Sequence, residues 1–359
     1  MNEGLAGGMK KFLGNPNVID VAESRRIGRS AILNGPPQNL LEVLREGGWA
    51  VIRHPRRAVQ TRRSTVYMFR WRSRRARRAL AGRGWDFVFQ TQTVFDAYIP
   101  GTPFFIFTDH SVLANGRYPR SFPTASWSSE WIRMEADAYQ RADRVFTTSE
   151  FARKSLIEDY GCPPQRVTAV GWAPNLAADD EGGVGARGHK SKERSVLFVG
   201  IDWERKGGPL LVEAFRRLRR TDKNVELRIV GCHPRLRGDG IRVLGRLSPA
   251  AVRAEYERAS VFCMPSWVEP SAAAYLEAAA CGLPVVATRV GATPECVQHG
   301  QTGYLCDAGN VECLTESLGD LLDRPDEAQR MGAEGRRIAA QLTWESVAEK
   351  IALGISQVL

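Results

Sequence analysis

Short apolar runs alternate with predicted helices along residues 195–288. Strands are expected at 195–200, 225–231, 241–247, 261–265 and 285–288, and helices at 209–220 and 248–260. Strands and helices that alternate in this way form a parallel sheet with helices on both faces. The pattern therefore predicts a doubly wound α/β domain in the C-terminal half.

Two glutamates lie around the expected start of a further helix. Glu269 follows the 261–265 strand and precedes that helix, and Glu277 lies within it. The free N–H groups and the dipole of a helix N-terminus attract anions. A carboxylate on each side suits a ligand with phosphates in its middle and hydroxyls at both ends, such as a nucleotide-sugar. Carboxylates near helix starts are also ordinary capping groups.

Two cations are expected at the same edge of the predicted sheet. Arg205 and Lys206 come just after the 195–200 strand, as Glu269 comes just after the 261–265 strand. Ligands of doubly wound sheets bind beyond the carboxyl ends of the strands. The chain thus places positive charge where a diphosphate group would bind.

Several motifs, taken in this order, resemble one family. They are the E-x7-E pair, Lys206-Gly207 after a strand, and the segments 281–288, 291–295, 300–304 and 342–348. From about residue 86 to residue 359 the chain is similar to the GT-B-fold retaining glycosyltransferases of the family 4 type, also called glycosyl transferases group 1. The resemblance implies two Rossmann-like doubly wound domains that face a cleft, and a hexosyltransferase that retains the anomeric configuration of its donor.

The resemblance also implies roles for individual residues. Lys206, with Arg205, would neutralise the donor diphosphate and stabilise the leaving group. Glu269 would contact hydroxyls of the transferred sugar, and Glu277 would hold the ribose hydroxyls. The remaining donor-binding positions are Gly200, Leu247, Ser271, Ala272 and Ala273. Among them, Leu247 would lie near the base, and backbone N–H groups at 272–274 would hold phosphate.

The chain departs from the family pattern at two places. Ile201 stands where the family usually has an arginine directly after a glycine, and Arg205 is a candidate to replace that charge. Ser271-Ala272 stands where the family usually has Phe-Gly, and only glycine approaches phosphate without adding a side chain. This departure motivates an alternative: a catalytically idle relative that binds a sugar nucleotide or a partner.

The N-terminal half continues the alternation with a second α/β domain. Strands are expected at 86–90, 103–108, 144–149 and 167–171, helices at 127–143 and 151–160, and a plausible helix at 40–46 and strand at 49–53 precede them. In the resembled family a histidine, or sometimes an aspartate, faces the sugar from the loop after the second strand. Asp109 and His110 stand there and complete the candidate catalytic set with Lys206 and Glu269. The alternatives are that Asp109 is a turn or cap residue and His110 a surface side chain.

Composition and the resemblance together give the domain boundaries. We expect an acceptor-side domain at 1–176, a linker at 177–194, a nucleotide-sugar-binding domain at 195–342, and a helix at 343–359 that crosses back onto the first domain. The linker contains almost no large apolar residues. Its GxGxxG sequence at 183–188 is not a dinucleotide fingerprint, because no strand precedes it and no helix follows it.

The entire net charge of +10 lies in residues 1–190, which hold 28 of the 50 basic and 18 of the 40 acidic side chains. The basic residues are densest in a predicted helical patch made of Arg70, Trp71, Arg72, Arg74, Arg75, Arg77 and Arg78. A basic helix with aromatic residues is typical of binding to an anionic membrane surface. A solvated helix face is the main alternative, and nucleic-acid binding is supported by the arginines alone.

Location and cofactors are inferred from what the chain lacks. No apolar run approaches the ~20 residues of a membrane span, and no signal-peptide pattern is present. The seven cysteines are scattered without zinc spacing, so we expect them to be reduced in a cytoplasmic protein that docks on the inner face of the cell membrane. No Asp-x-Asp follows a strand to hold a divalent cation, so we expect metal-independent transfer with the nucleotide-sugar as co-substrate. The acceptor would be a cell-surface glycan, a polysaccharide precursor or a lipid-linked sugar.

Overall fold

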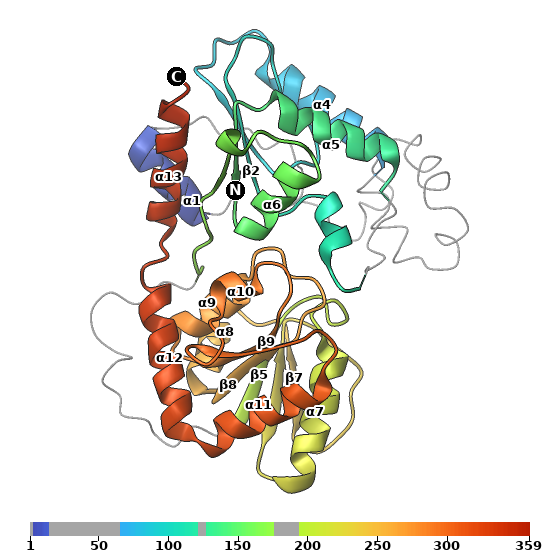
Figure 1. Ribbon diagram of the computed structural model, residues 1–359, viewed down its shortest axis with the longest axis vertical. Helices are drawn as coiled ribbons and strands as arrows, with labels where there is room; N and C mark the ends of the chain where they lie inside the picture. The colour runs from blue at the N-terminus through green and yellow to red at the C-terminus, as the bar shows by residue number, and fades with distance from the viewer. Residues whose placement is uncertain (1–2, 14–64, 121–126, 176–193) are drawn as a thin grey trace. The chain divides into compact units, whose positions relative to one another are not determined.

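A computed structural model describes residues 3–13, 65–120, 127–175 and 194–359 (Figure 1). These residues divide into two compact units. Unit 1 consists of the described parts of Met1–Gly116 and Ser121–Val170 together with Ala348–Leu359, and unit 2 of the described parts of Arg117–Arg120 and Gly171–Val347. The predicted helix at 40–46, the strand at 49–53 and nearly all of the linker lie outside the described residues.

Unit 2 is built on a parallel six-stranded sheet. Its strands are β5 (Ser195–Val199), β6 (Glu226–Val230), β7 (Ile241–Gly245), β8 (Val261–Met264), β9 (Val285–Thr288) and β10 (Gly303–Cys306). Their spatial order is β10-β9-β8-β5-β6-β7. The chain builds outward from β5 to β7 and then returns to β8 on the other side of β5. This reversal between β5 and β8 is the switch point at which such sheets bind ligands.

Helices cover this sheet on both faces. They are α7 (Gly208–Thr221), α8 (Pro249–Arg258), α9 (Ala273–Ala280), α10 (Thr293–Cys296), α11 (Val311–Asp323) and α12 (Pro325–Ala339). Right-handed crossovers that run in opposite directions from the switch point place α7 and α9 on opposite faces. Helix α11 packs beside α7, and α12 packs beside α9. The predicted alternation of strands and helices is confirmed, and Ser248 caps α8 as expected.

The predicted and observed element ends differ by one or two residues. Strand β7, for example, ends at Gly245 rather than at Leu247. Gly245 has a φ of +68°, which takes the backbone out of the extended conformation. His233 lies against this glycine, since a Cβ atom built on Gly245 would come within 2.0 Å of the imidazole.

Unit 1 contains a parallel four-stranded sheet. In spatial order the strands are β1 (Val88–Thr91), β2 (Phe104–Thr108), β3 (Arg144–Thr147) and β4 (Val167–Ala169). The helices are α1 (Glu3–Leu13), α4 (Val66–Leu80), α5 (Ser129–Arg141) and α6 (Glu150–Glu158), with 3-10 turns η2 (Leu113–Arg117) and η3 (Pro164–Arg166). Strand β2 is buried along its whole length, as expected of an inner strand of a parallel sheet.

The last helix, α13 (Trp344–Ser356), contributes most of its residues to unit 1. Ile351 and Ile355 are buried, and Gly354 leaves room for the ring of Phe146 in β3. An added Cβ at Gly354 would lie 2.5 Å from that ring, so a larger residue would push the helix away from the sheet.

The expectation that every cysteine is reduced is wrong. Cys306 at the end of β10 and Cys313 in the first turn of α11 form a disulfide, with Cα atoms 5.8 Å apart. The loop between them reverses at Gly309, whose φ is +88°, and Asn310 caps α11. This turn brings two cysteines seven positions apart into contact.

Within the described part of the chain, every helix is too short or too polar to cross a lipid bilayer.

Candidate active site

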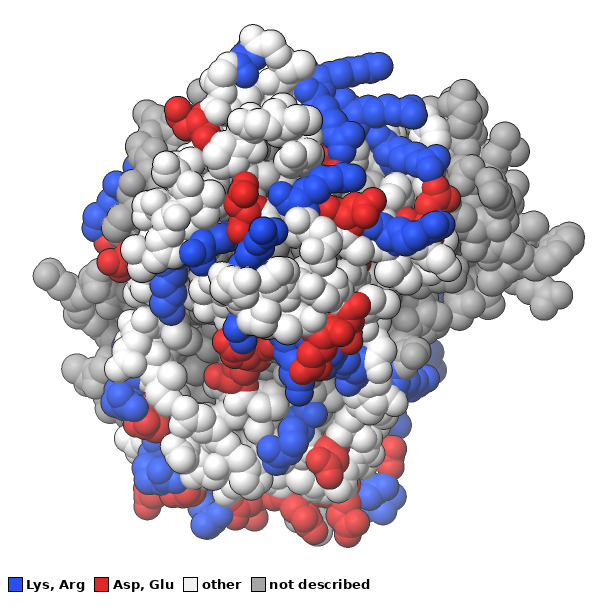
Figure 2. Space-filling model, turned by 45° about the horizontal axis from the view of Figure 1, so that its top comes forward, with Lys and Arg blue, Asp and Glu red and all other residues white. Residues whose placement is uncertain are grey.

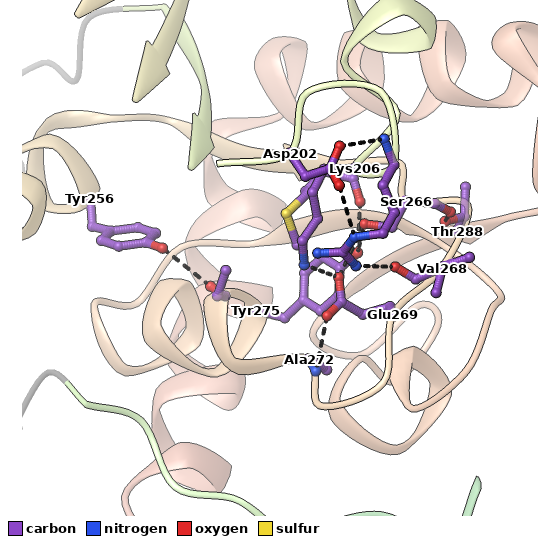
Figure 3. Close-up of polar contacts among 12 residues, drawn as sticks. Asp202, Lys206, Tyr256, Ser266, Val268, Glu269, Ala272, Tyr275 and Thr288 are labelled. Carbon is purple, nitrogen blue, oxygen red and sulfur yellow. Dashed lines mark hydrogen bonds and ion pairs between the residues drawn. The ribbon is translucent and has the colours of Figure 1, made fainter. Parts of the chain in front are cut away.

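A buried ion pair lies at the switch point of unit 2 (Figure 3). The Lys206 ammonium contacts Oε2 of Glu269. Ser266 Oγ donates to the same oxygen at 3.1 Å, and the N–H of Ala272 donates to Oε1 at 3.2 Å. The Glu269 carboxylate therefore connects a cation, a loop and the start of α9. Glu269 is only 1% exposed, so this network is buried.

The backbone around Lys206 depends on the glycine that follows it. Gly207 has a φ of +73°, and an added Cβ would lie 1.8 Å from the carbonyl oxygen of Pro265, just after β8. Only glycine therefore allows the turn after β5 to approach the loop after β8 this closely. That approach brings Lys206 within reach of Glu269.

Arg205 connects the same two loops. Its Nη1 donates to the carbonyl of Val268 at 2.7 Å, and its Nε lies 3.5 Å from the carboxylate of Asp202. The guanidinium thus adds positive charge to this edge while it braces the loop. Ile201, at the position where the resembled family has arginine, is 73% exposed.

The N-terminus of α9 lies beside this network, since α9 begins at Ala273. The N-cap residue, Ala272, makes no side-chain capping hydrogen bond, and its own N–H donates to the Glu269 carboxylate. Ala272 has a φ of +54°, in the left-handed region, which costs a residue with a Cβ roughly 1–2 kcal/mol. This conformation gives a physical reason for the glycine of the resembled family. Ser271 and Ala273 on either side are half-buried.

Glu277 lies on α9 and is held by two side chains that the sequence did not single out. The Tyr256 hydroxyl lies 3.3 Å from Oε2, and Asn175 Nδ2 lies 3.4 Å from Oε1. Burial raises the pKa of Glu277, and the hydrogen bonds from Tyr256 and Asn175 oppose this rise. In the sequence Tyr256 looks like any core aromatic of α8, so no signal could have identified it.

The other predicted donor positions lie at the same edge of the sheet. Gly200 follows β5, and an added Cβ there would lie 3.4 Å from the Lys206 side chain. Leu247 follows β7, is half-buried and packs against the core of unit 2. All the candidate donor-binding residues therefore belong to unit 2, where they lie around the carboxyl ends of β5, β7 and β8.

Asp109 and His110 lie in unit 1, in the loop after β2, and both are half-buried. His110 Nε2 is 3.2 Å from Oδ1 of Asn115, and the His110 carbonyl accepts a hydrogen bond from Thr108 Oγ1 at 2.7 Å. The candidate catalytic set is therefore divided, with two residues in each unit.

The basic patch lies on α4, and part of it has structural partners. Phe69 packs edge-on against Trp131 in the core, with ring centroids 5.0 Å apart. Arg77 binds the buried Asp96 at 2.6 Å, and Arg70 pairs with Glu130 on α5. Figure 2 shows Lys and Arg side chains gathered on this face of the protein.

The other patch arginines differ in exposure. Arg74 and Arg78 are exposed, and Arg75 stacks on Trp71 at 5.5 Å from the ring centroid. The face that could meet a partner is therefore narrower than the sequence suggests.

Comparison with known proteins identifies a family. The family described as "Glycosyl transferases group 1" matches residues 193–324, and "Glycosyltransferase Family 4" matches residues 32–171. An MMP alpha-(1->4)-mannosyltransferase of Mycolicibacterium hassiacum is 30% identical over 304 residues, which are 77% of this chain and 72% of that protein.

A second relative matches over a shorter stretch. It is a GDP-mannose-dependent alpha-(1-6)-phosphatidylinositol monomannoside mannosyltransferase of Mycolicibacterium smegmatis, 40% identical over 153 residues, which are 38% of this chain and 40% of that protein. Among solved structures, sucrose-phosphate synthase from Thermosynechococcus elongatus is similar with a TM-score of 0.64 and 21% identity, covering 81% of this chain and 78% of that one. The two parallel-sheet units and this similarity confirm the predicted GT-B fold.

Proposed function

Because the chain belongs to the glycosyltransferases of group 1 and family 4, we propose that it transfers a sugar from a nucleotide-sugar donor to a lipid-linked or glycan acceptor, with retention of anomeric configuration. The observation that carries the proposal is the Lys206–Glu269 pair at the switch point, beside the N-terminus of α9. A cation and a helix start at this place suit a diphosphate.

In this proposal the Lys206–Glu269 ion pair separates when the donor binds, and each side chain contacts the donor instead. Burial lowers the pKa of Lys206, and the Glu269 carboxylate opposes that effect. A diphosphate would add negative charge next to the ammonium and favour its charged form. The Glu269 carboxylate could then accept hydrogen bonds from hydroxyls of the transferred sugar, while Glu277 accepts them from the ribose. Arg205 and α9 add to the positive charge, so we expect turnover without a divalent metal.

The names of the relatives suggest which substrates to test first. The two relatives described above are mannosyltransferases, and the name of the second includes GDP-mannose and a phosphatidylinositol monomannoside. We therefore propose GDP-mannose as the first donor and a phosphatidylinositol mannoside as the first acceptor. The exposed arginines of α4 support an acceptor at an anionic membrane surface.

The test is a panel of GDP-, UDP-, ADP- and dTDP-sugars in a thermal-shift assay, with and without EDTA. A ligand that binds the folded state raises the melting temperature. We expect one nucleotide class to do so regardless of EDTA, and the same donor to release nucleotide when an acceptor is added. Donor binding without any release would favour the idle relative, for which Ala272 in place of glycine is the motivating observation.

A further inference from the structure

Glu135 in α5 is a buried carboxylate that no step of the proposed reaction uses. It is 3% exposed. Its oxygens accept hydrogen bonds from the Val112 N–H at 3.2 Å, from the Tyr139 hydroxyl at 3.3 Å and from the Tyr160 hydroxyl. A carboxylate with this burial is retained only where its hydrogen bonds offset the loss of water.

Each of these hydrogen bonds connects Glu135 to the loop after β2. Val112 belongs to that loop. Tyr160 Oη also accepts from the Leu113 N–H at 3.1 Å, and the Tyr139 hydroxyl lies 3.5 Å from the carbonyl oxygen of His110. One carboxylate thus anchors the segment that presents Asp109 and His110.

The Tyr139 hydroxyl has one proton and two acceptors, Oε1 of Glu135 and the carbonyl of His110. An ionised Glu135 attracts that proton more strongly than a carbonyl does. A protonated Glu135 has a proton of its own to donate, which leaves the Tyr139 hydroxyl to the His110 carbonyl. The protonation state of Glu135 therefore selects between two hydrogen-bond arrangements of the loop.

Glu135 also titrates in the working range. Burial raises its pKa to about 7, against the hydrogen bonds from Tyr160, Val112 and Tyr139. Burial raises the pKa of both tyrosines well above the usual range, so they stay neutral. The other ionisable groups at this place are Asp109 and His110 of the loop, and Asp159, which Ser155 binds at 2.7 Å.

We propose that Glu135 is a positioning residue for the transfer reaction: through Val112, Tyr139 and Tyr160 it fixes the loop that carries Asp109 and His110, and its ionised form selects one arrangement of that loop. This inference rests on the proposed function and on the place that the family resemblance implies for this loop, facing the transferred sugar.

The test compares kcat and KM across pH in wild-type protein and in Glu135→Gln, which keeps the shape and removes the charge. We expect wild-type kcat to fall below pH ~7, and Glu135→Gln to lower kcat at pH 8 by about 10-fold and to abolish the acidic limb. Donor KM should stay within about twofold, because the donor residues lie in unit 2. Tyr139→Phe should lower kcat likewise. Tyr98→Phe, a half-buried tyrosine packed on Phe104, is the matched control and should change nothing.

The outcomes separate this inference from the proposed function. If the wild type transfers sugar and Glu135→Gln keeps the same kcat and the same fall of kcat below pH ~7, the inference alone is overturned. A wild type that turns over no donor overturns the proposed function. In that case the 13Cζ resonance of Tyr139, assigned with Tyr139→Phe, decides. An inflection near pH 7 that Glu135→Gln removes supports control of the loop by Glu135, and a resonance that stays flat overturns it.

Discussion

Lys206, in the turn after β5, forms a buried ion pair with Glu269, in the loop after β8, at the point where the strand order of unit 2 reverses. The side chains of Lys206 and Glu269 are 14% and 2% exposed. Removing one partner of such a pair leaves an uncompensated buried charge, whereas replacing both can be nearly neutral. This difference allows stability and donor binding to be measured separately.

Lys206→Met should destabilise the fold by about 3–5 kcal/mol because Glu269 then stays charged without its cation. The double variant Lys206→Met/Glu269→Gln should recover most of that loss in urea unfolding. Neither variant should bind the donor or turn it over. A double variant with normal turnover would show that the pair is only structural.

Tyr256→Phe should weaken donor binding about fivefold, measured by calorimetry with the sugar nucleotide, because Glu277 loses a hydrogen bond of about 1 kcal/mol that orients it. The matched control is Tyr304→Phe, which removes a hydroxyl that donates to Asp320 at 2.6 Å in the same unit. Equal donor affinities in the two variants would argue against a role for Tyr256 in holding Glu277.

Ala272→Gly should raise the free energy of unfolding by about 1 kcal/mol, because glycine adopts the left-handed conformation at position 272 without strain. The opposite change at Gly207 tests the same reasoning. Gly207→Ala forces a Cβ toward the Pro265 carbonyl and should destabilise unit 2. If Ala272→Gly lowers stability, the assignment of left-handed strain to this residue is wrong.

The fold could be predicted because its signals are local. Each strand and helix of unit 2 has its own apolar pattern, and Lys206, Glu269 and Glu277 stand at strand ends or in a helix that this pattern locates. The contacts that the sequence did not reveal join distant positions. Tyr256 meets Glu277 from another helix, and Glu135 meets Val112 across 23 positions.

Two other features of the structure also differ from what the sequence suggested. Phe69 stands next to the arginines of α4 in the sequence, but its partner Trp131 lies on another helix and draws it into the core. Cys306 and Cys313 stand close in sequence, yet only the turn at Gly309 brings their side chains together. The partner of Phe69 is set by tertiary structure, and that of Cys306 by the conformation of the turn.

Stability should depend on pH through Glu135. Burial raises its pKa from 4.5 to about 7, so between these values the folded state binds more protons than the unfolded state. The free energy of unfolding should therefore fall as pH rises from about 4.5 to 7, by roughly 3 kcal/mol from this group. Glu135→Gln should lack this contribution in urea unfolding at pH 5 to 8. A wild-type advantage over Glu135→Gln that grows with pH would contradict the assignment.

Arg74 and Arg78 on α4 provide the test of membrane docking, since both are exposed. Each basic residue near an anionic surface contributes about 1 kcal/mol, so Arg74→Glu/Arg78→Glu should weaken binding to phosphatidylserine vesicles by at least about 30-fold. The matched control, Arg216→Glu/Arg220→Glu, makes the same charge change at exposed positions of α7 and should bind as wild type does. Vesicle sedimentation with and without phosphatidylserine gives the readout. If both variants lose binding equally, only net charge matters, and if neither does, the arginines of α4 form a solvated face.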